Sequence, residues 1–447
     1  MRTTCTRLRA PVILASLLAT AILSATASAA TSTWTPTTTF AVGKAYEPVP
    51  RAAIASDGTS VIAFESKTGK LMLSQGDVRG RFTPPRVIDR EGDVRDWSVA
   101  ARDDGGFIVV WEYARGIRAL VRAHHGSATY LSRVTDSSRE EINGVQVAAD
   151  PRGGWVIAER EFRRTKNRFY YVRAMTVNNR GQLVGPVQDL GPGDFGIDAR
   201  PTMALAVDDT GRAVLTFVPE TPPALTTPPT AVVSTRPHGG SFGAPVVLPG
   251  DPAGDPRVAV GAGGRAMIAA TQIASRGDAG IFGSPVVAPV SPAGALGVPF
   301  GPVVAHPKRA FGPSAAFTSA GRSVLVFSLK EASEPFESRA PVRAVAISAT
   351  GALGKLQTLT SAKAKEPVVM GLAGGRALTM WSGERGLGAS LAGGDGTFKA
   401  TAVPKGPPPP PFHFNSTNRD LRTGGRYAIF TWSREADGHV RVGIRKF

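Results

Sequence analysis

The stretch "SDGTSVIAFES" at residues 56–66 decides the fold, because a polar turn with a glycine is followed at once by an apolar run. This pattern predicts a tight turn that leads into a buried strand. Looser versions of it return at 103 ("DDGGFIVVW"), 151 ("PRGGWVIAE"), 208 ("DDTGRAVLTF"), 261 ("GAGGRAMIAA"), 318 ("TSAGRSVLVF"), 371 ("GLAGGRALTM") and 421 ("LRTGGRYAIF"). The turns are roughly 50 residues apart, which indicates a repeated supersecondary unit.

Each unit reads as four strands joined by glycine turns, as residues 51–88 illustrate. Four-stranded antiparallel units repeated around an axis form a β-propeller, whose strand edges are short and protected. We therefore expect an all-β chain, with a single propeller of eight blades, or seven if the weak unit around Gly263 is not a complete blade. Residues 32–42 ("STWTPTTTFAV") look like an outer strand, and we expect them to close the ring by pairing with the last blade.

The N-terminus predicts export. Residues 1–29 combine three arginines, an apolar stretch from about Pro11 to Leu23 and small residues at the end, which is typical of a secretory signal peptide. We expect a propeller domain over residues 30–447, secreted or associated with the cell envelope, with no membrane span after cleavage. The single cysteine, Cys5, lies in the signal peptide, so disulfides and thiol chemistry are not expected in the mature chain.

The composition describes a basic protein with an ordinary core. Hydrophobic residues make up 42% and charged residues 19%, and the formal net charge is +17. Such a charge attracts anionic polymers, although arginine-rich coding bias gives the same number, and no basic tract stands out. We expect a monomer whose partner is a protein or an anionic cell-envelope polymer, without specific binding of nucleic acid.

The opening repeat resembles that of TolB-type propellers, in which a turn with Asp-Gly precedes an apolar strand that ends in Phe. The resemblance lies at the level of the repeat and implies a propeller, which hosts many unrelated functions. The chain is more weakly similar to sialidase-type propellers. Their Ser-x-Asp-x-Gly-x-Thr-Trp turn is missing, and "GGDGTF" at 393–398 only approaches it.

Other motifs of catalysis are missing from the sequence. The six histidines lack metal-ligand spacing, and there is neither a phosphate-binding glycine loop nor a Gly-x-Ser-x-Gly elbow. We expect no cofactor and no metal site.

The candidate site lies where loops between blades meet the innermost strands. Asp96, Asp198 with Arg200, and Asp255 with Arg257 stand at three such entries. A ring of these side chains could grip an acidic sugar or supply acid-base catalysis on a glycosidic bond. The other interpretation, which we favour, is that Asp serves the turns and that Arg and Asp pair on a solvated surface.

Two further residues are candidates for a ligand-binding site. Glu159 stands six residues after its turn glycine, where other blades place an aromatic such as Phe64 or Trp111. If buried, it needs a partner such as Arg160 or Arg163, whereas a shifted strand would leave it solvated, which we favour. Tyr113 lies beside a variable loop and could stack on a carbohydrate if it is exposed.

Three functions are compatible with these observations. The sequence favours a noncatalytic binding module that presents its loop face to a cell-envelope polymer or a partner protein, and hence a protein that is not an enzyme. The first alternative is a glycoside hydrolase or lyase that acts on acidic polysaccharide. The second is a structural extracellular scaffold.

Overall fold

The computed structural model describes residues 33–42, 49–89, 94–113, 116–135, 141–163, 169–193, 203–219, 230–250, 253–277, 280–301, 303–304, 308–319, 321–331, 340–383, 386–405, 419–434 and 438–447. Residues 33–447 form one compact unit. Every regular element among the described residues is a β-strand, as the sequence predicts. No helix in this part of the chain is long and apolar enough to cross a membrane.

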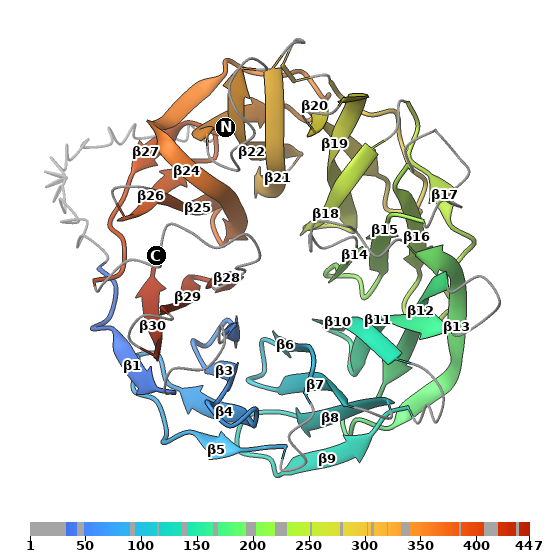
Figure 1. The fold of residues 1–447 in the computed structure, drawn as a ribbon, viewed down its shortest axis with the longest axis vertical. Coiled ribbons are helices and arrows are strands. Elements are labelled where there is room, and N and C mark those ends of the chain that lie inside the picture. The colour runs from blue at the N-terminus through green and yellow to red at the C-terminus, as the bar shows by residue number, and fades with distance from the viewer. Residues whose placement is uncertain are drawn as a thin grey trace, which may run out of the picture. The chain divides into compact units, whose positions relative to one another are not determined.

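The strands form antiparallel sheets that follow one another around a central axis (Figure 1). Five sheets have four strands: β2 (Arg51–Ile54), β3 (Ser60–Glu65), β4 (Leu71–Gly76), β5 (Arg86–Val87); β6 (Trp97–Ala101), β7 (Phe107–Tyr113), β8 (Gly116–Arg122), β9 (Thr129–Arg133); β10 (Glu141–Ala149), β11 (Trp155–Arg163), β12 (Phe169–Val177), β13 (Leu183–Gly193); β14 (Met203–Val207), β15 (Ala213–Phe217), β16 (Val232–Arg236), β17 (Val246–Val247); and β1 (Thr38–Ala41) with β30 (His439–Lys446), β29 (Tyr427–Arg434), β28 (Arg419–Gly424).

Two sheets depart from this number. One has three strands, β18 (Ala253–Gly261), β19 (Arg265–Gly277) and β20 (Gly280–Val290). The other has seven: β21 (Lys308–Ser319), β22 (Arg322–Glu331), β23 (Ala340–Ile347), β24 (Gln357–Leu372), β25 (Arg376–Gly383), β26 (Gly386–Ala392) and β27 (Phe398–Ala400). The long strand β24 lies in the middle of this sheet, as the outer strand of one group of four and the inner strand of the next.

The glycine turns join the first and second strands of each group. At the turn between β2 and β3, Gly58 has a φ of +85°, and its amide donates a hydrogen bond to the Ala55 carbonyl at 3.0 Å. The Asp57 carboxylate accepts a hydrogen bond from the Thr59 amide at 2.7 Å. Glycine tolerates this conformation without strain, and Asp stabilises the turn. All eight turns predicted from the sequence lie in such hairpins, while the number of blades stays a prediction because β24 serves two groups.

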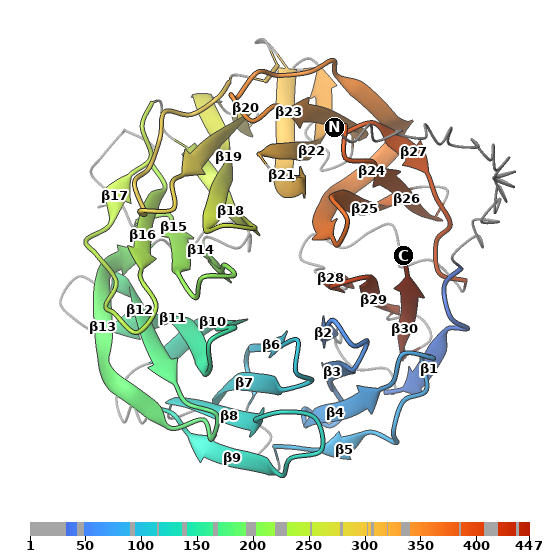
Figure 2. The ribbon, with the colours of Figure 1, turned by 180° about the vertical axis from the view of Figure 1, so that it is seen from behind.

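The first strand of the described chain pairs with the last. In the register of β1 and β30, Thr38 lies opposite Val442 and Phe40 opposite Val440. The Trp34 indole N–H donates a hydrogen bond to the Ala402 carbonyl at 2.8 Å, which ties the N-terminal segment to the loop after β27. Figure 2 shows β1 beside β30 from the other face. The pairing is the one expected for residues 32–42; closure of the whole ring stays a prediction.

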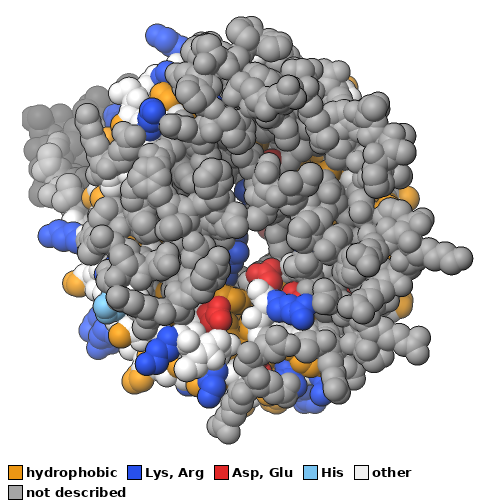
Figure 3. Space-filling view, viewed as in Figure 1, with side chains coloured by type: hydrophobic (Ala, Val, Ile, Leu, Met, Phe, Trp, Pro, Cys, Tyr) orange, Lys and Arg blue, Asp and Glu red, His pale blue; other side chains and the backbone are white. Residues whose placement is uncertain are grey.

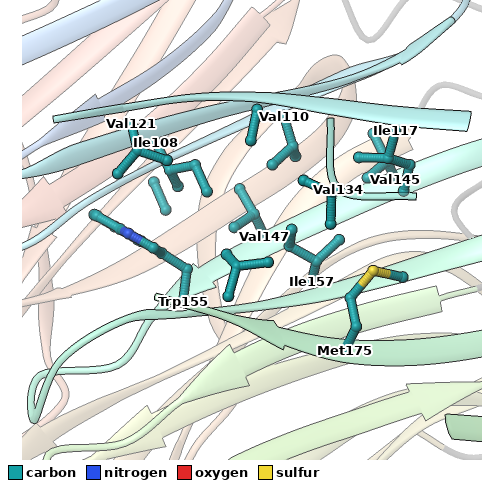
Figure 4. Close-up of a cluster of buried hydrophobic side chains, with 13 residues drawn as sticks. Ile108, Val110, Ile117, Val121, Val134, Val145, Val147, Trp155, Ile157 and Met175 are labelled. Atoms are coloured by element: carbon teal, nitrogen blue, oxygen red, sulfur yellow. The ribbon is translucent and has the colours of Figure 1, made fainter. Parts of the chain in front are cut away.

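The core lies between neighbouring sheets, because alternate residues of a strand point to opposite sides. On β7, Ile108 and Val110 pack toward β10–β13, whereas Val109 and Trp111 pack toward β2–β5. Figure 4 shows the first of these clusters, in which Trp155 and Ile157 of β11 meet the side chains of β7. The recurring aromatics are core residues, as predicted: Phe64, Trp111, Phe217, Phe327 and Trp381 are all buried.

Several arginines of this basic chain are buried structural residues. The Arg212 side chain, 6% exposed, donates to the Asp208 carboxylate at 2.9 Å and to the carbonyls of Gly264 and Ser291. Arg236, 2% exposed, pairs with Asp150 at 3.2 Å. A guanidinium with five donors suits such carbonyl-rich places between turns. Part of the positive charge therefore holds neighbouring sheets together and does not form a surface for polyanions.

Candidate functional site

Asp96 lies just before β6 and joins two sheets. Its Oδ1 accepts a hydrogen bond from the Trp97 amide at 2.9 Å, and its Oδ2 accepts one from the Val145 amide of β10 at 3.0 Å. Asp420 of β28 makes the equivalent contact, since its Oδ2 accepts from the Ala52 amide of β2 at 3.0 Å. Asp96 therefore has a structural role, and it remains partly exposed beside its neighbours.

The pKa of Asp96 is raised because burial disfavours its charged form. The positive charge of Arg51 and the two backbone amides oppose this rise, as does the smaller effect of the charge of Arg160. A Cβ placed on Gly144 would lie 4.0 Å from Asp96 Oδ2 and 3.7 Å from Arg160 Nη2. The lack of a side chain at Gly144 therefore leaves room for both groups. Gly144 has a φ of +122° and lies at an irregularity in the pairing of β10 with β11.

Glu112 lies behind Asp96, near the end of β7, and is 1% exposed. Neither carboxylate oxygen makes a hydrogen bond of good geometry with a residue that the structure describes. Burial, followed by the negative charge of Asp96, raises the pKa of Glu112 to about 8, although Arg95 and the Gly144 amide lower it in part. Glu112 is thus a carboxylic acid that keeps its proton at neutral pH.

Glu159 and Glu161 project from β11 toward the same region, and both are fully buried. Arg173, opposite Glu159 in the register of β12, forms an ion pair with each of them, at 2.8 Å to Glu161 Oε1. The expectation that Glu159 is solvated is therefore wrong. Its partner on the neighbouring strand is Arg173, whereas the pairing with Arg160 stays a prediction and the side chain of Arg163 lies outside the described residues.

These residues gather because of strand alternation. Ile108 and Val110 of β7 face Trp155 and Ile157 of β11 in the apolar part of the interface, so the next residues on these faces, Glu112 and Glu159, continue the same layer. We call Asp96, Glu112, Glu159, Glu161 and Arg173 the carboxylate seam. Apolar packing fills one end of the interface between β6–β9 and β10–β13, and the carboxylate seam fills the other.

The seam lies at the end of the sheets predicted to carry the site. Asp96 follows the connection from β5 to β6, and Glu112 precedes the connection from β7 to β8. On the face shown in Figure 3, Asp and Glu side chains lie beside the opening at the centre of the described part, with a Lys or Arg side chain next to them. No group of three or more His, Cys, Asp or Glu residues within the described ranges is arranged to hold a metal ion.

The other predicted site residues do not join this seam. Asp255 and Arg257 lie on β18, in a different sheet, where their side chains are 3.5 Å apart. Asp255 has a φ of +52°, unusual for a residue other than glycine. Asp198 and Arg200 lie outside the described residues. Of the predicted ring, the described part therefore shows Asp96 in the carboxylate seam and the pair Asp255–Arg257 in another sheet, and the ring itself stays a prediction.

Tyr113 is buried, which contradicts its interpretation as an exposed stacking residue. It is the last residue of β7 and belongs to the cluster with Trp97 and Leu71. The Arg118 guanidinium lies over its ring at 4.3 Å and pairs with the buried Asp89 at 3.4 Å. Packing and a cation–π contact explain this tyrosine without a carbohydrate.

Sequence reasoning missed Glu112, Glu161 and Arg173. The signal for Glu112 was its place at the end of the apolar run "FIVVWEY", where a charged residue faces the core side of a strand. Glu65 occupies the corresponding position one sheet earlier, and burial raises its pKa as well. The pairing of β11 with β12, which sets Arg173 beside Glu159, cannot be read from spacing, because a variable loop separates these strands.

The chain was compared with known proteins. No protein-family model and no curated protein matches it. Among solved structures it resembles an α-L-arabinanase from Penicillium chrysogenum in complex with arabinobiose, with 11% identity, a TM-score of 0.44, and coverage of 93% of this chain and 98% of that one. It also resembles the polysaccharide lyase Uly1, with 9% identity, a TM-score of 0.46, and coverage of 79% and 89%.

A third similar structure is that of prolyl endopeptidases, with 14% identity and a TM-score of 0.46 over 87% of this chain; the chain spans about half, 55%, of that protein. These neighbours are propeller-type enzymes. They contradict our expectation of a noncatalytic binding module, and with it the expectation that the protein is not an enzyme. At these identities no particular activity carries over to this chain. The resemblance to TolB-type repeats stays a prediction.

Proposed function

We propose that this protein is a polysaccharide-cleaving enzyme, a glycoside hydrolase or a lyase, in which Glu112 and Asp96 act as acid and base. The observation that carries the proposal is the pair itself: a buried carboxylic acid with a pKa of about 8 next to a partly exposed carboxylate. Cleavage of a glycosidic bond by carboxyl groups needs one proton donor and one base or nucleophile. Two neighbouring carboxyl groups in different environments, one of which keeps a proton at neutral pH, meet this need.

The environment sets the two roles. Asp96 accepts two backbone hydrogen bonds and lies near the positive charges of Arg51 and Arg160, which favour its ionised form against the effect of burial. Glu112 has only partial compensation for its burial, and the charge of Asp96 holds its proton in place. The raised pKa of Glu112 therefore keeps a proton on this side chain at neutral pH.

In the hydrolase form of the proposal, the bond between the anomeric carbon and the leaving oxygen breaks while Glu112 donates its proton to that oxygen. A water oxygen bonds to the anomeric carbon, and Asp96 takes the proton of this water. In the lyase form, Asp96 removes the carbon-bound proton next to a sugar carboxylate, and Glu112 again protonates the leaving oxygen. Arg173, paired with Glu159 and Glu161, holds the deeper part of the seam and does not move a proton.

The remaining expectations from the sequence accompany this proposal. Residues 1–29 act as a signal peptide and residues 30–447 as the secreted domain, and the polymer cleaved is an anionic one of the cell envelope or its surroundings. The basic net charge supports attraction to such a polymer.

The test is a cleavage assay of the purified protein against neutral and acidic polysaccharides. Release of reducing ends reports both reactions, and ultraviolet absorbance of an unsaturated product reports the lyase alone. Glu112→Gln removes the proton donor while keeping the shape and the neutral charge. We expect it to lower kcat by about 10²-fold or more, as loss of a general acid does.

The matched control is Glu65→Gln, because Glu65 occupies the equivalent place one sheet away. This variant should cleave like the wild type. If Glu112→Gln and Glu65→Gln retain the same activity as the wild type, Glu112 is not the acid and the proposal is wrong. If no polysaccharide of a broad panel is cleaved, the enzyme class itself is wrong.

A further inference from the structure

Arg51 is an arginine beside the carboxylate seam that has no partner among the described residues. It is the first residue of β2 and is partly exposed. Among the residues that the structure describes, it makes no hydrogen bond and no ion pair, in contrast to Arg212 or Arg236. The Trp97 indole N–H donates a hydrogen bond to the Ala63 carbonyl at 3.4 Å, and Ala63 lies opposite Arg51 in the register of β2 and β3, so Arg51 lies beside the segment of Asp96 and Trp97. The charge of Arg51 also lowers the pKa of Asp96.

The neighbouring carboxylates do not use the donors of Arg51. Asp96 already accepts from the amides of Trp97 and Val145. Asp420, next to β2, accepts from the Ala52 amide and pairs with Arg422 at 3.0 Å. Within the described ranges, therefore, no residue occupies the donors of Arg51, and its side chain is partly exposed. A planar fork of N–H groups in this state matches the two oxygens of a carboxylate.

We propose that Arg51 binds the carboxylate of a uronic acid residue and so makes the site specific for uronate-containing polysaccharides. The inference rests on the proposed function, since it places this carboxylate next to the Asp96–Glu112 pair. A bidentate contact fixes the orientation of a sugar ring as well as its position. It also places a positive charge where a substrate brings a negative one.

The experiment compares each polymer with its carboxyl-reduced form. The probes are polygalacturonate, alginate and hyaluronan, together with the same polymers after reduction of their carboxylates to alcohols. Wild type, Arg51→Gln, Arg51→Lys and Arg422→Gln are assayed for kcat/KM. Binding of uronic acid oligosaccharides is measured by calorimetry in parallel, so that the test does not depend on turnover.

We expect Arg51→Gln to lower kcat/KM or affinity for the carboxylated probe by about 10- to 100-fold, the range for a lost hydrogen bond to a charged group. For the reduced probe, kcat/KM and affinity should fall by no more than about twofold. Arg51→Lys should lose less than Arg51→Gln on the carboxylated probe, because lysine keeps the positive charge but not the fork of N–H groups. Arg422 already pairs with Asp420, so the control variant Arg422→Gln should leave the preference for carboxylated over reduced probes unchanged.

Each outcome separates the two proposals. Cleavage without a preference for carboxylated probes, or an equal loss on both probes in Arg51→Gln, overturns the role of Arg51 while the enzyme class stands. Arg51-dependent binding without cleavage supports the role of Arg51 and overturns the enzyme class. Neither binding nor cleavage overturns both.

Discussion

Glu112 should make the stability of this protein fall as the pH rises. Its pKa is 4.5 in an ordinary environment and about 8 in the folded chain. Between these values the folded state holds a proton that the unfolded state has lost, so the stabilisation is complete below pH 4.5 and decreases until the folded pKa is passed. Each pH unit changes the free energy of unfolding by about 1.4 kcal/mol, and the whole interval amounts to at most about 5 kcal/mol.

The variant Glu112→Gln tests this pH dependence of the free energy of unfolding, since glutamine has nearly the same volume as glutamate and does not titrate. The assay is urea denaturation of wild type and variant at several pH values from 5 to 9, followed by tryptophan fluorescence. We expect nearly equal stability near pH 5. The free energy of unfolding of the wild type should then fall relative to the variant by up to about 1.4 kcal/mol per pH unit and level off above the folded pKa.

The comparison with Glu65→Gln controls for a general effect of removing an acidic residue. Glu65 is half-buried, and burial raises its pKa in the same direction, so its variant should show a weaker version of the same pH dependence. Parallel stability curves for wild type and Glu112→Gln across this range would refute the reasoning, because they would mean that Glu112 ionises in the folded protein as readily as in the unfolded chain.

Two further predictions concern the sheets that support the seam. Trp155→Ala should lower the free energy of unfolding by about 3–5 kcal/mol, because a fully buried indole leaves a cavity in the interface with β7; unchanged denaturation midpoints would contradict this. Asp420→Ala should lower it by about 1–3 kcal/mol, since the Ala52 amide loses its acceptor; hydrogen exchange at that amide should accelerate, and unaltered protection would count against the contact between β28 and β2.

Much of the fold could be predicted from the sequence, because the signal is local and repeated. A glycine that needs positive φ and an apolar run after it appear together at each of the eight hairpins, and the strands begin where the pattern predicts, as at Ser60 and Phe107. The repetition compensates for the weakness of any single turn. Around Gly263, where the pattern is weak, the sheet has three strands. Leu296 and Phe300, which lie where a fourth strand was expected, make only isolated bridges to β20.

The site could be predicted only in part, because it depends on which strands face each other. The break in the aromatic pattern at Glu159 was visible, and the structure places this carboxylate where Phe217 and Phe327 lie in other sheets. Its exposure was predicted incorrectly, because a one-residue shift or bulge of the strand was expected to leave this side chain in solvent. The partner, Arg173, comes from the adjacent strand, and strand register follows from loops that carry no local signal.

The position of the seam follows from what a propeller can tolerate. An interface between sheets is long enough to be apolar at one end, where Trp155, Ile157 and Val110 pack, and polar at the other. Burying Glu112 without full compensation destabilises the folded state, and many other apolar interfaces in the chain offset this loss. If the carboxylate seam only held the sheets together, its buried charged side chains could be replaced without loss of stability by an aromatic side chain, as the sheet β6–β9 has in Trp111 at the position equivalent to Glu159. We therefore interpret the buried acid, and not the exposed turns, as the feature that relates this fold to chemistry.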